Sequence, residues 1–272
     1  MKRAKYCLAW VLASLALGAC GAGVVEKTAG PPPSLGGIWK GELVDPSGVT
    51  LPAFMLITED GRFFSVAETS DNCSEVAQGA LALKGNAYKG SGSFGVIGAT
   101  GALGVQLDCA FADGSVWGTA SLSGSVTTGI DLSFTAADTT SLGTELQSTT
   151  GTLFFDAAYN EASSLSKVAG NWLLTTGAVL SIDANGSLFS QDIVNGCVVN
   201  GKVSLINASY NAYAVSATYS SCQAGTSALN DLTATGLMTL DDTQIPNVLY
   251  VGYSMTLPGG EMLTIVSNST GG

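Results

Sequence analysis

The chain has 272 residues, a formal net charge of −11 and no histidine. An acidic surface repels nucleic acid and anionic lipid headgroups, which argues against nucleic-acid binding. Without histidine the chain lacks the most common general base and metal ligand, and a Ser-His-Asp triad is excluded. Charged residues make up only 11% of the chain, and small residues are abundant. This composition is typical of an exported β-protein.

The first 19 residues have the three parts of a secretory signal peptide. Lys2, Arg3 and Lys5 form a positive start, an apolar run of 12 residues extends from Tyr6 to Leu17, and small residues follow. Such a run is too short to cross a bilayer core of about 30 Å. We therefore expect residues 1–19 to be removed on export.

The sequence Leu17-Gly18-Ala19-Cys20 resembles the lipobox of bacterial lipoprotein precursors. In that family a diacylglycerol is first attached to the Cys sulfur, the signal is then cut before the Cys, and the new amine is acylated with a fatty acid such as palmitate. The resemblance implies that Cys20 is lipidated and that several acyl chains hold the protein stably at a membrane. An ordinary signal peptide with a Cys at its cleavage site is the alternative. Gly21, in place of Asp, is similar to the pattern for sorting to the outer membrane, on its periplasmic or surface-exposed face.

The mature chain would carry seven basic and 21 acidic residues, a net charge of −14, because Lys2, Arg3 and Lys5 leave with the signal. Residues 20–33 show no periodicity and end in three prolines. This pattern predicts a flexible tether between the lipidated Cys and the folded part.

From residue 34 onward the sequence consists of two halves that resemble each other. Segments ending in Trp39 and Trp172 open the two halves, and each half continues with a turn, a Cys, a strand-like segment, an Asn-Ala-Tyr triplet and a second Cys. This order predicts a duplicated unit, with one copy at 34–158 and the other at 159–272. Chance similarity between two β-rich halves is the alternative.

Strand-like segments rich in β-branched and aromatic residues alternate with turn signals along both halves. Asp-Gly or Asn-Gly pairs, which suit two-residue hairpin turns, stand at 60–61, 113–114, 185–186, 195–196 and 200–201. We predict an antiparallel meander of about eight strands in each half, closed into a barrel so that no edge strand is left exposed. One short helix is expected, from Glu161 to Val168.

Gly-x-Trp occurs at 37–39 and at 170–172, where each meander begins. This motif resembles the start of lipocalins and their calycin relatives, in which the Trp plugs the closed end of the barrel. The resemblance implies an all-β fold of two tandem antiparallel meander β-barrels of calycin-like form.

Four cysteines remain after signal removal and lipidation: Cys73, Cys109, Cys197 and Cys222. An even number in an exported chain predicts two disulfides, with three connectivities open. Duplication favours pairing within each unit, Cys73 with Cys109 and Cys197 with Cys222. Reduced, buried cysteines are the alternative. A zinc site is less favoured because neither pair is closely spaced and no histidine can complete it.

Gly90 to Gly95 matches G-x-G-x-x-G, but no helix follows it, so we do not predict a nucleotide site. We expect this stretch and the glycines up to Gly104 to form an uncharged, flexible loop between two strands.

Carboxylates are the catalytic groups that remain, since glycoside hydrolysis needs only two of them. Nothing in the sequence pairs the candidates, which are Asp108, Asp192, Asp241, Asp242 and Glu261. Asp241-Asp242 is interpreted first as a turn. We therefore predict no enzyme, no catalytic residue, no metal and no cofactor.

The aromatic residues Trp39, Trp172, Tyr88 and Tyr213 are candidates to line a ligand cavity, although core packing is the more frequent role of such residues. The expected function is that of a lipid-anchored, non-enzymatic cell-envelope protein that binds a small apolar ligand or a protein partner. A purely structural envelope module and a carboxylate-based hydrolase are the alternatives.

Overall fold

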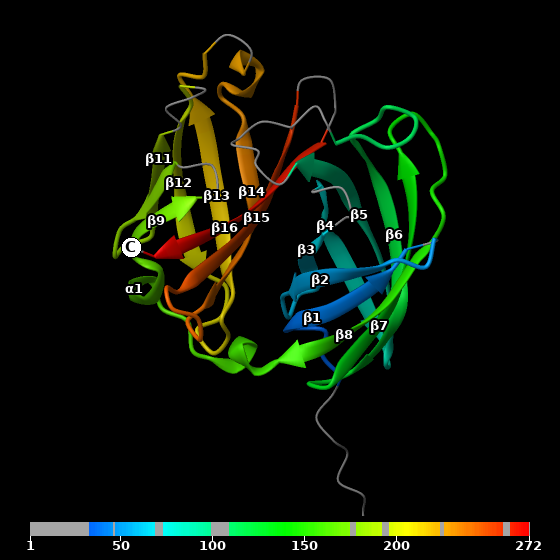
Figure 1. Cartoon of the computed structure of the whole chain (residues 1–272). Coiled ribbons are helices and arrows are strands. Elements are labelled where there is room, and N and C mark those ends of the chain that lie inside the picture. The colour runs from blue at the N-terminus through cyan, green and yellow to red at the C-terminus, as the bar shows by residue number, and fades with distance from the viewer. Residues whose placement is uncertain are drawn as a thin grey trace, which may run out of the picture. The chain divides into compact units, whose positions relative to one another are not determined.

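A computed structural model describes residues 33–45, 47–68, 73–98, 109–174, 178–191, 196–223, 226–257 and 262–271. Two antiparallel meander sheets account for most of these residues, as Figure 1 shows. The prediction of an all-β chain is confirmed. The predicted signal peptide, the lipidation site Cys20 and almost all of the tether lie outside the described residues.

The first sheet is a closed antiparallel barrel of eight strands. Its strand β1 pairs with β2 on one side and with β8 on the other, which closes the ring. The strands are β1 (Gly37–Val44), β2 (Thr50–Ile57), β3 (Arg62–Glu68), β4 (Cys73–Lys84), β5 (Ala87–Gly98), β6 (Trp117–Thr127), β7 (Asp131–Thr140) and β8 (Thr149–Asp156).

The second sheet repeats the meander with strands β9 to β16. Strand β9 pairs with β10 over four residue pairs and with β16 over three, so the pairing returns to its start through a short seam. The strands are β9 (Gly170–Leu174), β10 (Val179–Ile182), β11 (Ser187–Gln191), β12 (Val198–Leu205), β13 (Tyr213–Ser220), β14 (Thr233–Asp241), β15 (Val248–Thr256) and β16 (Met262–Gly271).

The Gly-rich stretch at 90–95 is part of strand β5, so the prediction of a loop there is wrong. Strand β5 pairs with β4 and with β6 along this stretch. A Cβ on Gly90 or Gly92 would lie 2.1 Å from a backbone oxygen of β4. These glycines therefore let strand β4 approach β5 closely. The predicted continuation at 99–108 lies outside the described residues.

The helical segments are shorter than predicted. Helix α1 covers only Leu165–Val168, while Ala157–Asn160 form the 3₁₀ helix η1 and Ser227–Leu229 form η2. Asp156 caps η1, because its side chain accepts a hydrogen bond from the Ala158 N–H. None of the helices in the described ranges is long and apolar enough to pass through a bilayer.

Each half contains one disulfide, in the pairing that duplication favours. Cys73, at the start of β4, is bonded to Cys109, in the segment before β6. Cys197, before β12, is bonded to Cys222, after β13. The first bond therefore ties strand β4 to the connection before β6, and the second joins the connection before β12 to the connection after β13.

The two sheets share a buried core in addition to their separate ones. Ile38, Leu56 and Phe64 from the first sheet pack with Leu237 from the second and with Tyr159 from the connection between them. Residues 33–272 accordingly form one compact unit. The boundary predicted between residues 158 and 159 falls within η1, where both side chains are buried.

Asn211 is the polar centre of this shared core and is only 3% exposed. Its side-chain amide donates to the carbonyl oxygens of Ala158 and Leu240, and its Oδ1 accepts from the Leu240 N–H. The Asn211 carbonyl accepts a further bond from the Thr239 hydroxyl. One side chain thus ties the connection between the halves to strand β14.

Candidate functional site

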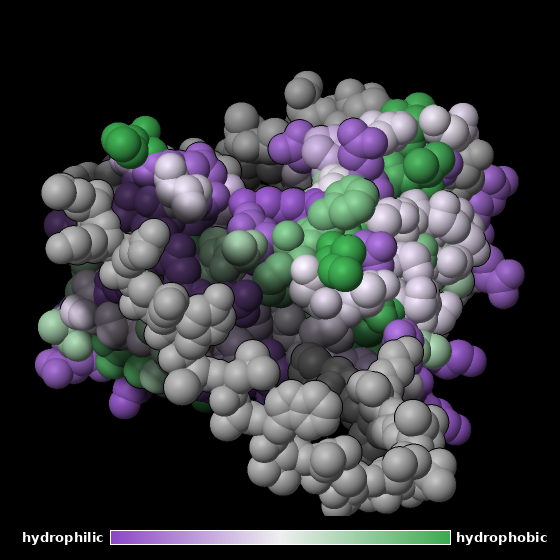
Figure 2. All heavy atoms as spheres, turned by 90° about the horizontal axis from the view of Figure 1, so that it is seen from below, coloured by the Kyte–Doolittle hydropathy of each residue, from purple (hydrophilic) through white to green (hydrophobic). Residues whose placement is uncertain are grey.

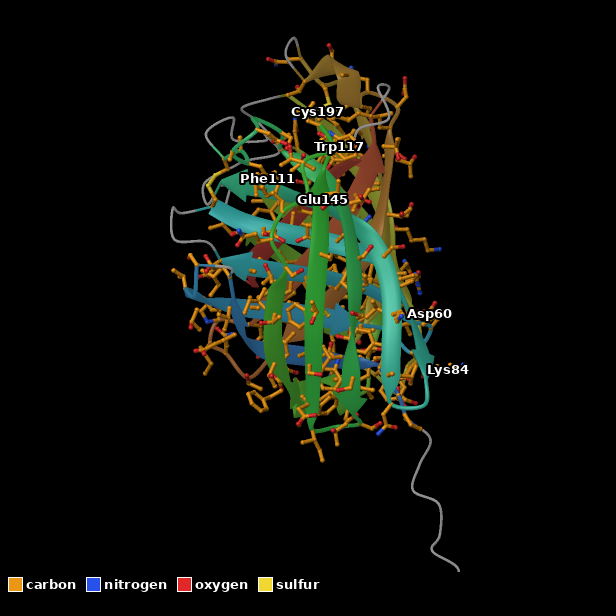
Figure 3. The ribbon with its side chains drawn as sticks, turned by 90° about the vertical axis from the view of Figure 1, so that its right-hand side faces the viewer. Asp60, Lys84, Phe111, Trp117, Glu145 and Cys197 are labelled. Carbon is orange, nitrogen blue, oxygen red and sulfur yellow. A yellow bond between two sulfur atoms is a disulfide. The ribbon has the colours of Figure 1, made fainter. Side chains whose placement is uncertain are left out.

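A small cavity lies inside the first barrel, toward the end where β4 begins and β7 ends. It offers about 40 Å³ to the centres of water-sized molecules. Figure 3 faces this barrel and shows Phe111, Trp117 and Glu145 near that end, with Asp60 and Lys84 toward the opposite one. The cavity is lined by residues of β1 to β4 and β6 to β8.

Small side chains create this space. Five alanines line the cavity where longer side chains would fill the barrel: Ala53, Ala67, Ala77, Ala120 and Ala136. Nearer the other end, the interior is packed with large residues such as Trp39, Phe63 and Leu132. The barrel is therefore filled at one end and open inside at the other.

Among the described residues that line the cavity, the only charged groups are two carboxyls, those of Glu75 on β4 and Asp138 on β7. Asp138 is 5% exposed, and its Oδ1 has no hydrogen-bond partner. Burial raises the pKa of Asp138 to about 6. Burial and, secondarily, the negative charge of Asp138 raise the pKa of Glu75 to about 7. Both groups therefore titrate near neutral pH.

Strand alternation places both carboxyls inside the barrel. Along β7, Leu132, Phe134 and Asp138 are buried at even positions, because side chains of a strand point alternately to its two faces. Along β4, Glu75 has the same parity as the core residue Leu81. Asp138 stands opposite Ala120 in the ladder, so one of the small residues of the cavity wall lies beside it.

The cavity is small in chemical terms. A water molecule needs about 10–15 Å³ of such space, so the cavity has room for about three waters or a group of similar size. A lipid or a sugar ring does not fit within it. Its apolar wall and its two carboxyls suit a small molecule, or the small end of a larger one, that brings hydrogen-bond donors.

The four aromatic candidates are core residues, and none lines this cavity. Trp39 and Tyr88 belong to the first core, Trp172 and Tyr213 to the second, and each is at most 4% exposed. The indole N–H of Trp39 donates to the Leu35 carbonyl, and that of Trp172 donates to the carbonyl four residues before it in the same way. This equivalent bond in both halves agrees with the expected duplication.

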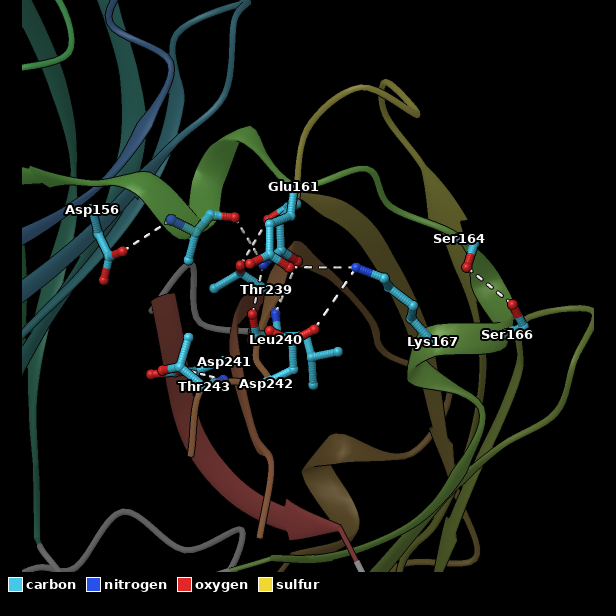
Figure 4. A network of polar contacts seen from close by, with 12 residues as sticks. Asp156, Glu161, Ser164, Ser166, Lys167, Thr239, Leu240, Asp241, Asp242 and Thr243 are labelled. Atoms are coloured by element: carbon cyan, nitrogen blue, oxygen red, sulfur yellow. Dashed lines mark hydrogen bonds and ion pairs between the residues drawn. The ribbon is translucent and has the colours of Figure 1, made fainter. Parts of the chain in front are cut away.

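Two of the predicted carboxylate candidates lie in a polar network next to the shared core, shown in Figure 4. The Lys40 ammonium lies 2.7 Å from Asp156 Oδ2 and 3.4 Å from Asp241 Oδ2. Burial alone would raise the pKa of Asp241, but hydrogen bonds from Thr243 and Gln244 hold it below its usual range. Asp241 is thus an ionised structural group and is unsuited to act as an acid.

Asp242, the other candidate in Figure 4, makes an ion pair with Lys167, which also contacts Glu161. The remaining candidates Asp108, Asp192 and Glu261 lie outside the described residues. The predicted carboxylates are therefore not brought together into a cleft by any contact in the described part of the chain.

A second concave surface, an open groove of about 410 Å³, is lined by residues of β3, β4 and β12 to β14. Arg62 and Lys202 are its charged lining residues, and both are exposed. Arg62 is already paired with Asp60, at 2.9 Å. The groove therefore lacks the buried, unpartnered group that distinguishes the cavity in the first barrel.

Sequence reasoning missed Glu75 and Asp138. The sequence feature that could have identified them is their odd or even position within the strand. Glu75 and Asp138 are acidic residues at positions where the alternation of the strand places apolar or small side chains. Parity shows that a side chain points inward, but it does not show which inward residues of distant strands share a space. No family model and no curated protein matches the chain.

Proposed function

We propose that this chain is a lipid-anchored, non-enzymatic cell-envelope protein that binds a small molecule inside its first barrel. In this proposal both sheets are calycin-like barrels in tandem, and Cys20 carries the acyl chains. The cavity of the first barrel is the observation that carries the binding function. It combines apolar walls with a buried carboxyl whose oxygen has no partner, and buried polar groups of folded proteins are ordinarily hydrogen-bonded.

The lipid anchor rests on the lipobox resemblance and is tested by fractionation. A Cys20→Ala variant expressed in the native host should leave the membrane fraction or accumulate as uncut precursor, whereas a Cys7→Ala variant should behave like the wild type. Membrane-bound Cys20→Ala of mature mass would refute the anchor.

The face of the molecule seen in Figure 2 favours a small-molecule ligand over a protein partner. On the face shown in Figure 2, apolar residues lie in several separate groups among polar ones. Protein-binding sites are more often marked by large continuous apolar patches.

The hydrolase alternative would use the same two carboxyls, since both titrate near neutral pH. A glycosidase, however, must hold a sugar ring between its carboxyls, and a cavity with room for about three waters is too small for one. The cavity therefore favours binding over glycoside hydrolysis.

Native mass spectrometry of the mature protein, purified in detergent from its own host, tests the binding function. A co-purifying small molecule should disappear in Ala120→Val, which fills the cavity, and persist in Ala82→Val, a change on the exposed side of β4. A bound mass that survives Ala120→Val would place the ligand elsewhere. An apo mass, with no exchangeable ligand in host extract, would favour a structural module.

A further inference from the structure

We propose that the group bound in this cavity is a primary ammonium, so that the ligand class is small primary amines. This inference rests on the proposed binding function and specifies its chemistry. Asp138 and Glu75 would pair with the ammonium, and the apolar wall would contact its short alkyl part.

The charges of the cavity favour a cationic ligand. Asp138 and Glu75 are both acidic, and none of the lining residues that the structure describes is basic. An anionic ligand would be repelled. A neutral apolar ligand would leave a buried carboxylate without a partner, which is costly in a water-poor site. A cation compensates both charges at once.

The oxygen of Asp138 that lacks a hydrogen-bond partner favours a ligand with N–H donors. Asp138 Oδ1 accepts no bond and is shielded from solvent, so the missing partner is a donor. An ammonium brings three N–H donors and no acceptor. Ser65 and Thr149 are also lining residues, and a hydroxyl group can accept a further N–H. A quaternary ammonium has no N–H and could not supply the missing bond.

The volume and the apolar walls of the cavity favour an ammonium with a short alkyl chain. Room for about three waters accommodates an ammonium with a chain of about two or three carbons. Met55, Leu122 and Leu153 are among the lining residues, and they offer contact to methylene groups. A bare metal ion would make no use of these walls. In the described part of the chain, no three Asp, Glu, Cys or His side chains gather closely enough to hold one.

The test uses n-propylammonium chloride as the probe and 1-propanol as its uncharged analogue, on the whole mature protein at constant ionic strength. Binding is followed by NMR titration. A ligand of four non-hydrogen atoms is limited to a Kd on the order of 0.1 mM at best. We expect saturable binding of propylammonium in the millimolar range at pH 8, at least tenfold tighter than binding of propanol. We also expect it to be at least tenfold weaker at pH 5, where both carboxyls are protonated.

Matched variants separate the carboxyl pair from general surface charge. Asp138→Asn and Glu75→Gln should each weaken propylammonium binding at least tenfold. Glu145→Gln removes the same charge from an exposed position at the same end of the barrel, labelled in Figure 3, and should leave binding unchanged. Circular dichroism confirms that each variant is folded. If Asp138→Asn does not fold, Glu75→Gln alone tests whether the carboxyl pair binds the ammonium.

The outcomes distinguish this inference from the proposed function beneath it. Equal binding of propanol and propylammonium, or binding unchanged in both carboxyl variants, would refute the amine and leave a ligand cavity in place. Equally tight binding of sodium or calcium would replace the amine with a metal cation. No saturable binding of any probe, together with an apo protein in the host, would overturn both proposals.

Discussion

Replacing Asp138 with Asn should make the protein more stable at neutral pH. In the folded protein the Asp138 carboxyl is 5% exposed and has an oxygen without a partner. Its pKa rises from the ordinary value of 3.8 to about 6 because the site is desolvated. Asn has nearly the same shape and stays neutral at every pH, so it removes the cost of a buried charge.

The direction in which the free energy of unfolding changes with pH follows from proton linkage. Between pH 3.8 and about 6, the unfolded chain releases the Asp138 proton while the folded chain keeps it. The free energy of unfolding of the wild type therefore falls as pH rises through this window. Above pH 6 the group is ionised in both states and the loss stays constant. The difference between the two pKa values corresponds to about 3 kcal/mol.

Urea unfolding of wild type and Asp138→Asn at pH 4, 6 and 8 measures this difference. The variant should be more stable by about 3 kcal/mol at pH 8, and this advantage should shrink toward zero near pH 4. Contributions from carboxyls that do not interact with Asp138 cancel between the two proteins. Glu75 adds to the advantage of the variant in the same direction, because the negative charge of Asp138 helps to raise its pKa. Glu145→Gln should show no such trend. An advantage that is the same at every pH would refute the assignment of a raised pKa to Asp138.

Three further predictions concern the architecture. Asn211→Ala should lower the free energy of unfolding by about 3 kcal/mol, because it leaves several buried backbone groups unpaired; Asn207→Ala, at an exposed turn, should cost less than about 1 kcal/mol. Joint replacement of Cys73 and Cys109 by Ser should cost about 3–4 kcal/mol, since the bond closes a loop with a sequence separation of 36, and an unchanged urea midpoint would contradict this. Thermolysin should spare the connection 157–164, where several side chains are buried, and stable separate halves would show that the shared core is dispensable.

Local patterns predicted a large part of this fold. Period-two alternation and Gly-containing turns depend only on neighbouring residues, so the meander could be recognised in both halves. The disulfides agree with the pairing that the predicted duplication favours, because a duplicated unit would copy a bond made within it. The short helix was placed correctly at its end, Val168, but its start was wrong, because residues 161–164 are not helical and the helix begins only after its N-cap Ser164.

The Gly-rich stretch shows where local patterns mislead. Gly90 to Gly95 has the composition of a loop, yet it pairs as a central strand of the barrel. Its glycines are explained by backbone atoms of the neighbouring strands, which approach to a distance that no Cβ allows. The closure of the barrel determines which strands lie beside this stretch, and the local composition of the sequence does not indicate that closure.

The chain by itself therefore determined the class of fold and the meander order, and the likeness of its two halves favoured the disulfide pairing that is observed. Tertiary structure alone decided that Glu75 and Asp138 line one cavity, that alanines leave it open, and that both sheets share a core. Strand direction is a property of a few successive residues. Which inward side chains meet depends on the closure of the whole ring, because β4 and β7 are separated by two other strands of the sheet.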